Sequence, residues 1–372
     1  MFQVLSRRAF LASAGWLAAC SRKPKPGYSG YAFVANEEDR AVAAVDLNAL
    51  TLVRHIRLDA APISLLSEAR RKSVYALTAE KGIVYEISSR TLERVRWNTI
   101  CMQASGMKAR PGGESLWVLS RKPRQLIEVE LEGFTPRRRI ELPEDCGDFD
   151  LSPQGQKALV PFPQTGQVAL VDLETGAIRR VDCGSAVSQA RFRKDGRQWI
   201  AAHQDRRLLS IFDTASSRLV VRLPLAVRPH HLCFKADGGQ LFVTGEGMDA
   251  VVIVFPYSTE VAETVVAGNA PGAMAVSSRE PEFLFVANPR AGQVTILNID
   301  TRKMVGATQV GSEPHQIVVT PDNQFALVVN RQSGDLAVIY ITPTAKRTRA
   351  PAALLTMVPV GSKPVSAVVQ AV

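Results

Sequence analysis

LFVAN at residues 284–288 is one of eight similar segments that return along the chain at a nearly constant interval. A fixed period in this range is typical of a solenoid, a propeller or another repeat array. Successive segments end 41 to 43 residues apart, and the eight are AFVAN (32–36), VYALT (74–78), LWVLS (116–120), ALVPF (158–162), WIAAH (199–203), LFVTG (241–245), LFVAN (284–288) and ALVVN (326–330).

One period contains four short apolar runs separated by turns. After LFVAN come the alternating run QVTILNI (293–299), then MVGATQV (304–310) and HQIVV (315–319). Alternation and β-branched residues are typical of strands, and the TPDN that follows has the residues that tight turns favour. Four strands per period predict one blade of a β-propeller. No long helical period follows residue 30, which disfavours a helical solenoid.

Each class of strand has eight members, so the sequence predicts an all-β propeller with eight four-stranded blades. Seven blades is the alternative, if one unit fails to close. The repeated region begins with a strand of the second type (31–36) and ends with a strand of the first type (364–372). We therefore expect the C-terminal strand to complete the N-terminal blade, which would close the ring and remove its unpaired edges.

Several short motifs resemble the YVTN-repeat propellers over residues 31–372. They are FVAN (33–36 and 285–288), VDL (45–47 and 171–173), V-G-x-x-P (310–314 and 360–364) and TPDN (320–323). The resemblance implies the propeller fold. It implies little about function, because propellers host many unrelated activities.

The first twenty residues are predicted to be a targeting segment. Arg7-Arg8 within SRRAFL resembles a twin-arginine export signal, and the apolar run that follows is too short to span a bilayer. LAAC at 17–20 resembles a lipoprotein processing box, so we expect an acyl anchor on Cys20. The domain prediction is a signal at 1–20, a basic tether at 21–30 and the propeller at 31–372, on the periplasmic side of the cell envelope.

The formal charge is +10, and cleavage before Cys20 would remove two arginines and leave +8. The positive residues are scattered along the chain, without a stripe or interleaved aromatics, so nucleic acid is not expected as a partner. An acidic small ligand, an envelope protein and the membrane itself are the partners that we expect, with the chain as a monomer. Solvated surface is the simpler interpretation of the same charge.

The remaining cysteines and acidic residues favour structural roles. Cys233 is predicted to be a small buried hydrophobe. A disulfide between two of Cys101, Cys146 and Cys183 is one option in an oxidising compartment. The acidic residues at the ends of the third-quarter strands recur with the repeat and predict turn or cross-strand hydrogen bonds; they are Asp46, Glu130, Asp172 and Asp213.

The candidate binding residues cluster at one end of the strands. His230 and His231 follow Arg228-Pro229 at the start of one predicted innermost strand, and His315 follows Glu313-Pro314 two blades on. His203 ends a second-type strand, and Glu246 opens the equivalent loop of the next blade. Imidazoles in such a place can bind an anionic or carbonyl-bearing ligand, act as a base or ligate a metal. Capping of the strand by hydrogen bonds is the structural alternative.

Three hypotheses for function follow. The preferred one is a non-enzymatic, lipid-anchored platform that binds a ligand or a protein. The second is a lactonase-like hydrolase that uses His230 or His315 with Arg228, because the Pro-His start is similar to that of 6-phosphogluconolactonase-type propellers. The third is a tetrapyrrole or metal carrier, since eight-bladed propellers occur in haem-containing nitrite reductase. No catalytic residue, cofactor or metal ligand is indicated by a specific motif.

Overall fold

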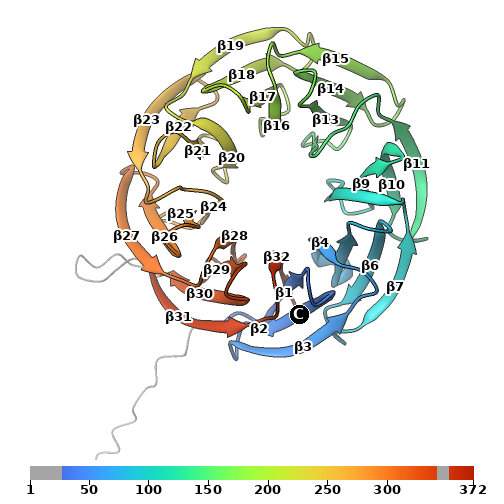
Figure 1. Ribbon diagram of the computed structural model, residues 1–372, viewed down its shortest axis with the longest axis vertical. Coiled ribbons are helices and arrows are strands. Elements are labelled where there is room, and N and C mark those ends of the chain that lie inside the picture. Colours follow the sequence, from blue (N-terminus) through green and yellow to red (C-terminus); the bar gives the residue numbers. More distant parts are fainter. Residues whose placement is uncertain (1–26, 342–351) are drawn as a thin grey trace, which may run out of the picture.

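The computed structural model describes residues 27–341 and 352–372, and it shows eight four-stranded antiparallel sheets arranged in a ring (Figure 1). Each sheet is one blade, with its strands ordered from the ring axis to the rim. The prediction of eight blades is confirmed, and the alternative of seven is wrong. The described residues contain one short helix, η1 (Ala69–Arg71), and none long and apolar enough to cross a bilayer.

Blades 1 to 4 are given from the axis outwards. Blade 1 contains β32 (Pro364–Ala371), β1 (Gly30–Asn36), β2 (Ala41–Asp46) and β3 (Thr51–Arg57). Blade 2 contains β4 (Pro62–Glu68), β5 (Ser73–Thr78), β6 (Ile83–Ser88) and β7 (Arg94–Thr99). Blade 3 contains β8 (Gln103–Ala109), β9 (Ser115–Lys122), β10 (Arg124–Glu130) and β11 (Thr135–Glu141). Blade 4 contains β12 (Asp150–Leu151), β13 (Lys157–Phe162), β14 (Gln167–Asp172) and β15 (Ile178–Asp182).

Blades 5 to 8 follow the same order. Blade 5 contains β16 (Val187–Phe192), β17 (Gln198–His203), β18 (Leu208–Asp213) and β19 (Leu219–Pro224). Blade 6 contains β20 (Arg228–Phe234), β21 (Leu241–Glu246), β22 (Ala250–Phe255) and β23 (Glu260–Val266). Blade 7 contains β24 (Met274–Val276), β25 (Phe283–Asn288), β26 (Gln293–Asn298) and β27 (Lys303–Gln309). Blade 8 contains β28 (Pro314–Val319), β29 (Phe325–Asn330), β30 (Asp335–Ile341) and β31 (Ala352–Pro359).

The ring closes as the sequence predicts. β32 pairs antiparallel with β1, from Gly30 opposite Ala371 to Asn36 opposite Pro364. Val365 and Val368 of β32 pack against the core shared with blade 2. The last strand therefore joins the two ends of the repeat without leaving β1 as an unpaired edge.

The hydrophobic core lies between the blades. Eight clusters of buried side chains fill the eight interfaces between neighbouring blades. In β5, Val74 and Ala76 pack toward blade 1, whereas Tyr75 and Leu77 pack toward blade 3. Successive side chains of a strand point to opposite faces, and here both faces are buried. This is why the second and third strands of each blade read as continuous apolar runs.

Two innermost strands are shorter than the sequence predicts. β12 has only two residues and β24 only three. Near β12, two aspartates hold the chain to neighbouring inner strands through side chains: Asp150 accepts from Lys108 Nζ at 3.0 Å, and Asp148 accepts from Arg191 Nη1 at 2.6 Å. Side-chain ion pairs thus connect the inner part of blade 4 to the inner strands of blades 3 and 5.

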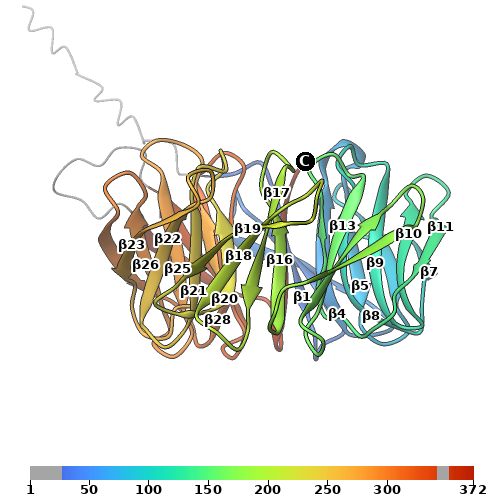
Figure 2. The same cartoon turned by 90° about the horizontal axis from the view of Figure 1, so that it is seen from above.

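The ring has two faces of different construction, and the strands run between them (Figure 2). One face carries the connections between blades and the loops between the second and third strands; we call it the loop face. The other carries the described hairpin turns within the blades, and in blade 1 the C-terminal end of β32 beside the start of β1; we call it the turn face. Three of the repeat acids act in these turns, as predicted, because Asp46, Asp172 and Asp213 each accept backbone N–H bonds from the following residues.

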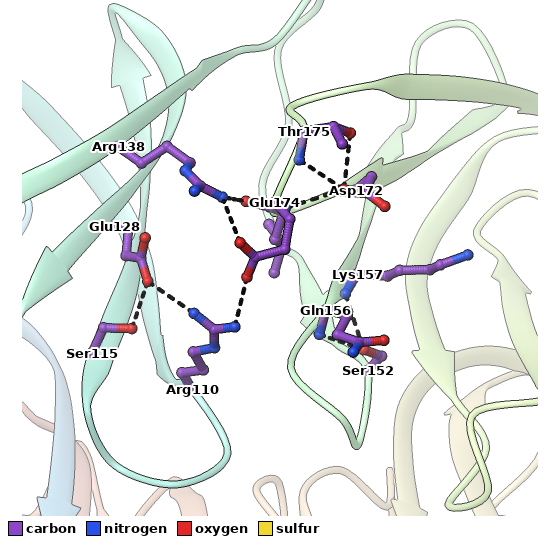
Figure 3. Close-up of polar contacts among 11 residues, drawn as sticks. Arg110, Ser115, Glu128, Arg138, Ser152, Gln156, Lys157, Asp172, Glu174 and Thr175 are labelled. Atoms are coloured by element: carbon purple, nitrogen blue, oxygen red, sulfur yellow. Dashed lines mark hydrogen bonds and ion pairs between the residues drawn. The ribbon is translucent and has the colours of Figure 1, made fainter.

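Ion pairs join neighbouring blades near the turn face (Figure 3). In blade 3, the buried Glu128 accepts from Ser115 Oγ at 2.8 Å and from Arg110 Nη1 at 3.3 Å. Arg110 Nη2 also donates to Glu174 of blade 4 at 2.8 Å, and Arg138 contacts the same carboxylate at 3.5 Å. Each charge in this network has an opposite partner, so the turn face is occupied by structural contacts at this interface.

Candidate functional site

The structure places five of the six predicted binding residues at the axial end of the loop face. Arg228, His230 and His231 lie on β20, and Arg228 pairs across the sheet with Glu246 at the end of β21. His315 occupies the equivalent part of β28, two blades further round the ring. All five are exposed at their side chains.

His203 is separated from this group because it is completely buried. Its Nδ1 lies 2.6 Å from Ser185 Oγ and its Nε2 lies 2.8 Å from Ser210 Oγ. Asn288 stands at the same position of blade 7 and bonds Thr295, also seven residues on, at 2.9 Å. Burial lowers the pKa of His203. His203 is therefore a polar connector inside blade 5, and the expectation that one ligand contacts it together with His230 and His315 is wrong.

A recurrent β-bulge displays the two remaining equivalent histidines. The pairing register shifts between Pro229 and His231, and again between Pro314 and Gln316, so that His230 and His315 are the unpaired residues. The same bulge recurs in other blades, where the unpaired residues are Ile63, Ser188 and Val365. Bulges re-aim side chains and are frequent next to functional sites. Here they turn two imidazoles out of the ladder at equivalent places.

Gly272 occupies the equivalent position in blade 7, between the two histidines. Its N–H donates to Ala287 O, continuing the ladder beyond β24. A Cβ built on Gly272 would meet Pro289 at 3.5 Å, an ordinary van der Waals contact, so a side chain here would extend beside that proline. A cavity of about 420 Å³ lies here, and its wall includes His230, His231, Glu246, Gly272 and Arg290. The loop face therefore has a recess between blades 6 and 7, with His230 in its wall.

Glu246 makes loose contacts with Arg228 and His230 in this recess. His230 Nε2 lies 3.8 Å from Glu246 Oε1, and Arg228 Nη1 lies 3.9 Å from Glu246 Oε2. All three side chains are largely exposed, and such pairs contribute little free energy. The backbone beneath is tight, because a Cβ on Gly245 would lie 1.7 Å from the carbonyl oxygen of Arg228. A ligand carboxylate can therefore replace Glu246 at small cost while the strand position stays fixed.

The other two histidines are held in the neutral form. Desolvation by the surrounding protein, with smaller contributions from the nearby His230 and His315, lowers the pKa of His231 to about 4. Burial also lowers the pKa of His315, with a contribution from Arg331. A neutral imidazole has one free nitrogen lone pair, which can accept a hydrogen bond, take a proton or bind a metal.

A second and larger cavity lies at the seam between blades 8 and 1, and its wall includes Glu313, two residues before His315. Its volume is about 780 Å³. Arg331 Nη2 and Lys363 Nζ, both in its wall, each lie 3.3 Å from the same oxygen, Oε2 of Glu37. The buried Nε of Arg331 has no hydrogen-bond partner. Arg331 and Lys363 are the cations of this wall, which also contains Glu38 and Glu313, so the seam has mixed charge.

The cysteines form no part of the site. The thiols of Cys101, Cys146, Cys183 and Cys233 are free, so no disulfide joins the neighbouring connections. Cys233 is half-buried, and the other three are buried. Within residues 27–341 and 352–372, no group of three or more His, Cys, Asp or Glu side chains is placed to hold a metal ion. Cys20 lies outside the described residues.

Comparisons with known proteins agree on the class of fold. A family model described as "Lactonase, 7-bladed beta-propeller" matches residues 211–355. The seven-bladed β-propeller protein Rv1057 of Mycobacterium tuberculosis is 25% identical over 139 residues, which are 36% of this chain. The chain spans only 35% of the length of that curated relative. Both names describe seven-bladed propellers, whereas this ring has eight blades.

Solved structures resemble the whole ring. Dihydro-heme d1 dehydrogenase NirN, in complex with DHE, matches with a TM-score of 0.75 at 13% identity, over 95% of this chain and 78% of that one. Hydrazine synthase of Kuenenia stuttgartiensis matches with a TM-score of 0.60 at 17% identity, over 76% of this chain and 96% of that one. A protein of unknown function from Desulfotomaculum acetoxidans matches with a TM-score of 0.62 at 13% identity, over 92% of this chain and 99% of that one. The chain is thus a β-propeller, and at these identities the likeness concerns the fold.

Proposed function

We propose that this β-propeller is an exported, lipid-anchored binding protein whose loop face holds a small acidic ligand. The observation that carries the proposal is the recess over Gly272, whose wall includes the bulged His230, with His315 displayed by the equivalent bulge of blade 8. The twin arginines and LAAC ending at Cys20 support export and anchoring on the periplasmic side. An envelope protein that delivers or receives the ligand is the partner that this arrangement suits.

The charges around the recess favour an acidic ligand. Arg228 lies on one side of Gly272, and Arg331 and Lys363 lie beyond His315 on the other. Their carboxylate partners, Glu246 and Glu37, are shared between cations. Guanidinium groups bind carboxylates strongly when the geometry is bidentate. A ligand with carboxylates at two edges therefore fits better than a neutral one.

Among acidic ligands we favour a carboxylated tetrapyrrole. Arg228 and Arg331 would bind the carboxylates of such a ligand, and His231 or His315 would supply a neutral imidazole nitrogen to it. If the macrocycle carries iron, the metal would bring its own redox chemistry. The whole-ring likeness to NirN, solved with DHE, is consistent with such a ligand. The residues that this chain contributes bind and orient it; none is assigned a chemical step.

The lactonase-like hydrolase is the second candidate, because the lactonase family model covers Arg228, His230 and His315. In that reaction an imidazole would remove a proton from water, and the water oxygen would attack the lactone carbonyl. Arg228 would stabilise the oxyanion, and the ring oxygen would leave with the proton from the imidazole, giving a hydroxy acid. Hydrolysis of a lactone by the purified protein, lost in His230→Ala, would favour this candidate.

The test is a titration with coproporphyrin, a carboxylated tetrapyrrole, followed through its visible absorption. We expect saturable binding to the wild type, and a loss of affinity of about tenfold or more for Arg228→Ala and for His315→Ala, because each removes a hydrogen bond to a charged group. Matched controls are His55→Ala and Arg90→Ala, whose side chains are exposed on the rim and the turn face. No binding by the wild type, or equal losses in the controls, would contradict the proposed ligand class.

A further inference from the structure

The described chain enters the ring at a fixed point on the turn face. Tyr28 donates its N–H to Leu47 O at 3.3 Å, and Ser29 O accepts from Val372 N at 3.4 Å. The Tyr28 side chain is 8% exposed and packs in the core between blades 8 and 1. The C-terminus lies on this same face (Figure 2). The preceding residues therefore start from a rigid position opposite the loop face.

The distance that the tether can cover is set by its length. Seven residues lie between Cys20 and Tyr28, so the chain makes eight steps from one Cα to the next. A fully extended chain covers about 3.3–3.6 Å per residue, so the acylated cysteine can lie at most about 26–29 Å from Tyr28. Any bend shortens this reach, because the maximum applies only to the straight chain.

The ring is too deep for this tether to cross. β32 has eight residues, which at about 3.3–3.4 Å each give a depth of about 27 Å between the faces. Tyr28 leads into β1, the second strand from the axis, so two strand spacings of about 4.8 Å separate it from the rim. The path around the rim to the loop face is therefore about 37 Å, which exceeds the maximum reach.

We infer that the turn face of blades 8 and 1 rests against the lipid surface, and that the loop face is held away from it. The inference rests on the proposed acylation of Cys20. Arg22, Lys23 and Lys25 within the tether add positive charge that suits anionic headgroups. The recess over Gly272 then opens toward the water-soluble side, about one ring depth from the bilayer. Its ligand is exchanged with a soluble carrier and not with the membrane beneath.

Energy transfer to labelled lipids tests this orientation. The acylated protein is reconstituted in phosphatidylethanolamine–phosphatidylglycerol vesicles that carry an acceptor dye, with a donor dye on one introduced cysteine. Ala49→Cys places the donor on the turn face and Glu38→Cys places it on the loop face of the same blade; both positions are exposed. The native thiols interfere little, because burial raises their pKa.

We expect stronger transfer from Ala49→Cys than from Glu38→Cys. An insertion of about 40 flexible residues after Pro26 should reduce the difference, since the tether then reaches around the rim. Equal or reversed transfer in the protein of native length would overturn the orientation. Intact mass is measured first: an unmodified Cys20 would overturn the anchor on which the orientation rests, whereas porphyrin binding at the loop face would remain testable on the soluble protein.

Discussion

Glu128→Ala should destabilise the ring far more than Glu174→Ala, although both remove a carboxylate from one network (Figure 3). The Glu128 side chain is only 2% exposed, whereas that of Glu174 is 53% exposed. Glu128 holds the buried Ser115 hydroxyl at 2.8 Å and Arg110 at 3.3 Å. Glu174 holds Arg110 and Arg138 from the neighbouring blade.

The size of the effect follows from what each change leaves unpaired. Loss of a hydrogen bond to a charged group costs about 1.5–3 kcal/mol, and an unsatisfied buried hydroxyl adds about 1 kcal/mol. Removing one partner of a fully buried ion pair costs about 3–5 kcal/mol, but Arg110 is one-quarter exposed and keeps Glu174. We therefore expect about 2–3 kcal/mol for Glu128→Ala. For the exposed Glu174 we expect a much smaller loss, because solvent screens its contacts with Arg110 and Arg138.

Urea denaturation of the two variants and the wild type measures the difference in free energy of unfolding. Glu86 offers an internal replicate: it is buried in blade 2, accepts from Ser73 Oγ at 2.8 Å and contacts Arg96 Nε at 2.5 Å. Glu86→Ala should cost about as much as Glu128→Ala. The reasoning is refuted if Glu174→Ala costs as much as Glu128→Ala, or if neither buried carboxylate matters.

Three further predictions concern the anchor, the histidines and the thiols. Cys20→Ala should move the protein from the membrane fraction to the soluble fraction of the envelope, and membrane fractionation like that of the wild type would exclude the anchor. In the unfolded chain His231 takes up a proton with the ordinary His pKa of 6.5, whereas in the folded protein its pKa is about 4. The unfolded state therefore binds more protons between these values, and the free energy of unfolding should fall as the pH drops from 6.5 toward 4. Melting temperatures at pH 7.5 and pH 5 check this, and His231→Gln should reduce the difference; an unchanged difference would exclude His231 as a cause. The four native thiols outside the signal should alkylate only after unfolding, because burial raises their pKa; rapid labelling of native protein would contradict their placement.

The propeller fold could be predicted from the sequence because each repeat corresponds to one blade. Eight blades follow from the period of about 42 residues with four apolar runs in each. The β1–β32 closure follows because the repeat begins with a second-type strand and ends with a first-type strand. Both faces of a middle strand are buried against neighbouring blades, so the apolar runs are unmistakable. The turn roles of Asp46, Asp172 and Asp213 were also predictable, because they recur with the period.

The site was only partly predictable from the sequence. Pro-His at 229–230 and 314–315 marked the loop face, but the bulge that displays the two histidines depends on cross-strand register. The recess lies over Gly272. That Gly272 is equivalent to His230 and His315 becomes clear only when the innermost strands of blades 6, 7 and 8 are compared. His203 is buried and does not reach the loop-face site, contrary to the prediction. It ends the second strand of its blade, as the buried Asn36, Asn288 and Asn330 do in theirs, and this shared position indicates a polar connector. Free thiols in successive connections could not be told from a disulfide by spacing alone.

The most direct test of the loop-face site is a crystal structure of the protein with the small molecule that co-purifies from its own envelope. The account predicts that this molecule is acidic and lies over Gly272, with His230 or His315 in contact and a carboxylate at Arg228 or Arg331. A ligand bound instead at the turn face or on the rim, with the recess over Gly272 empty, would contradict it.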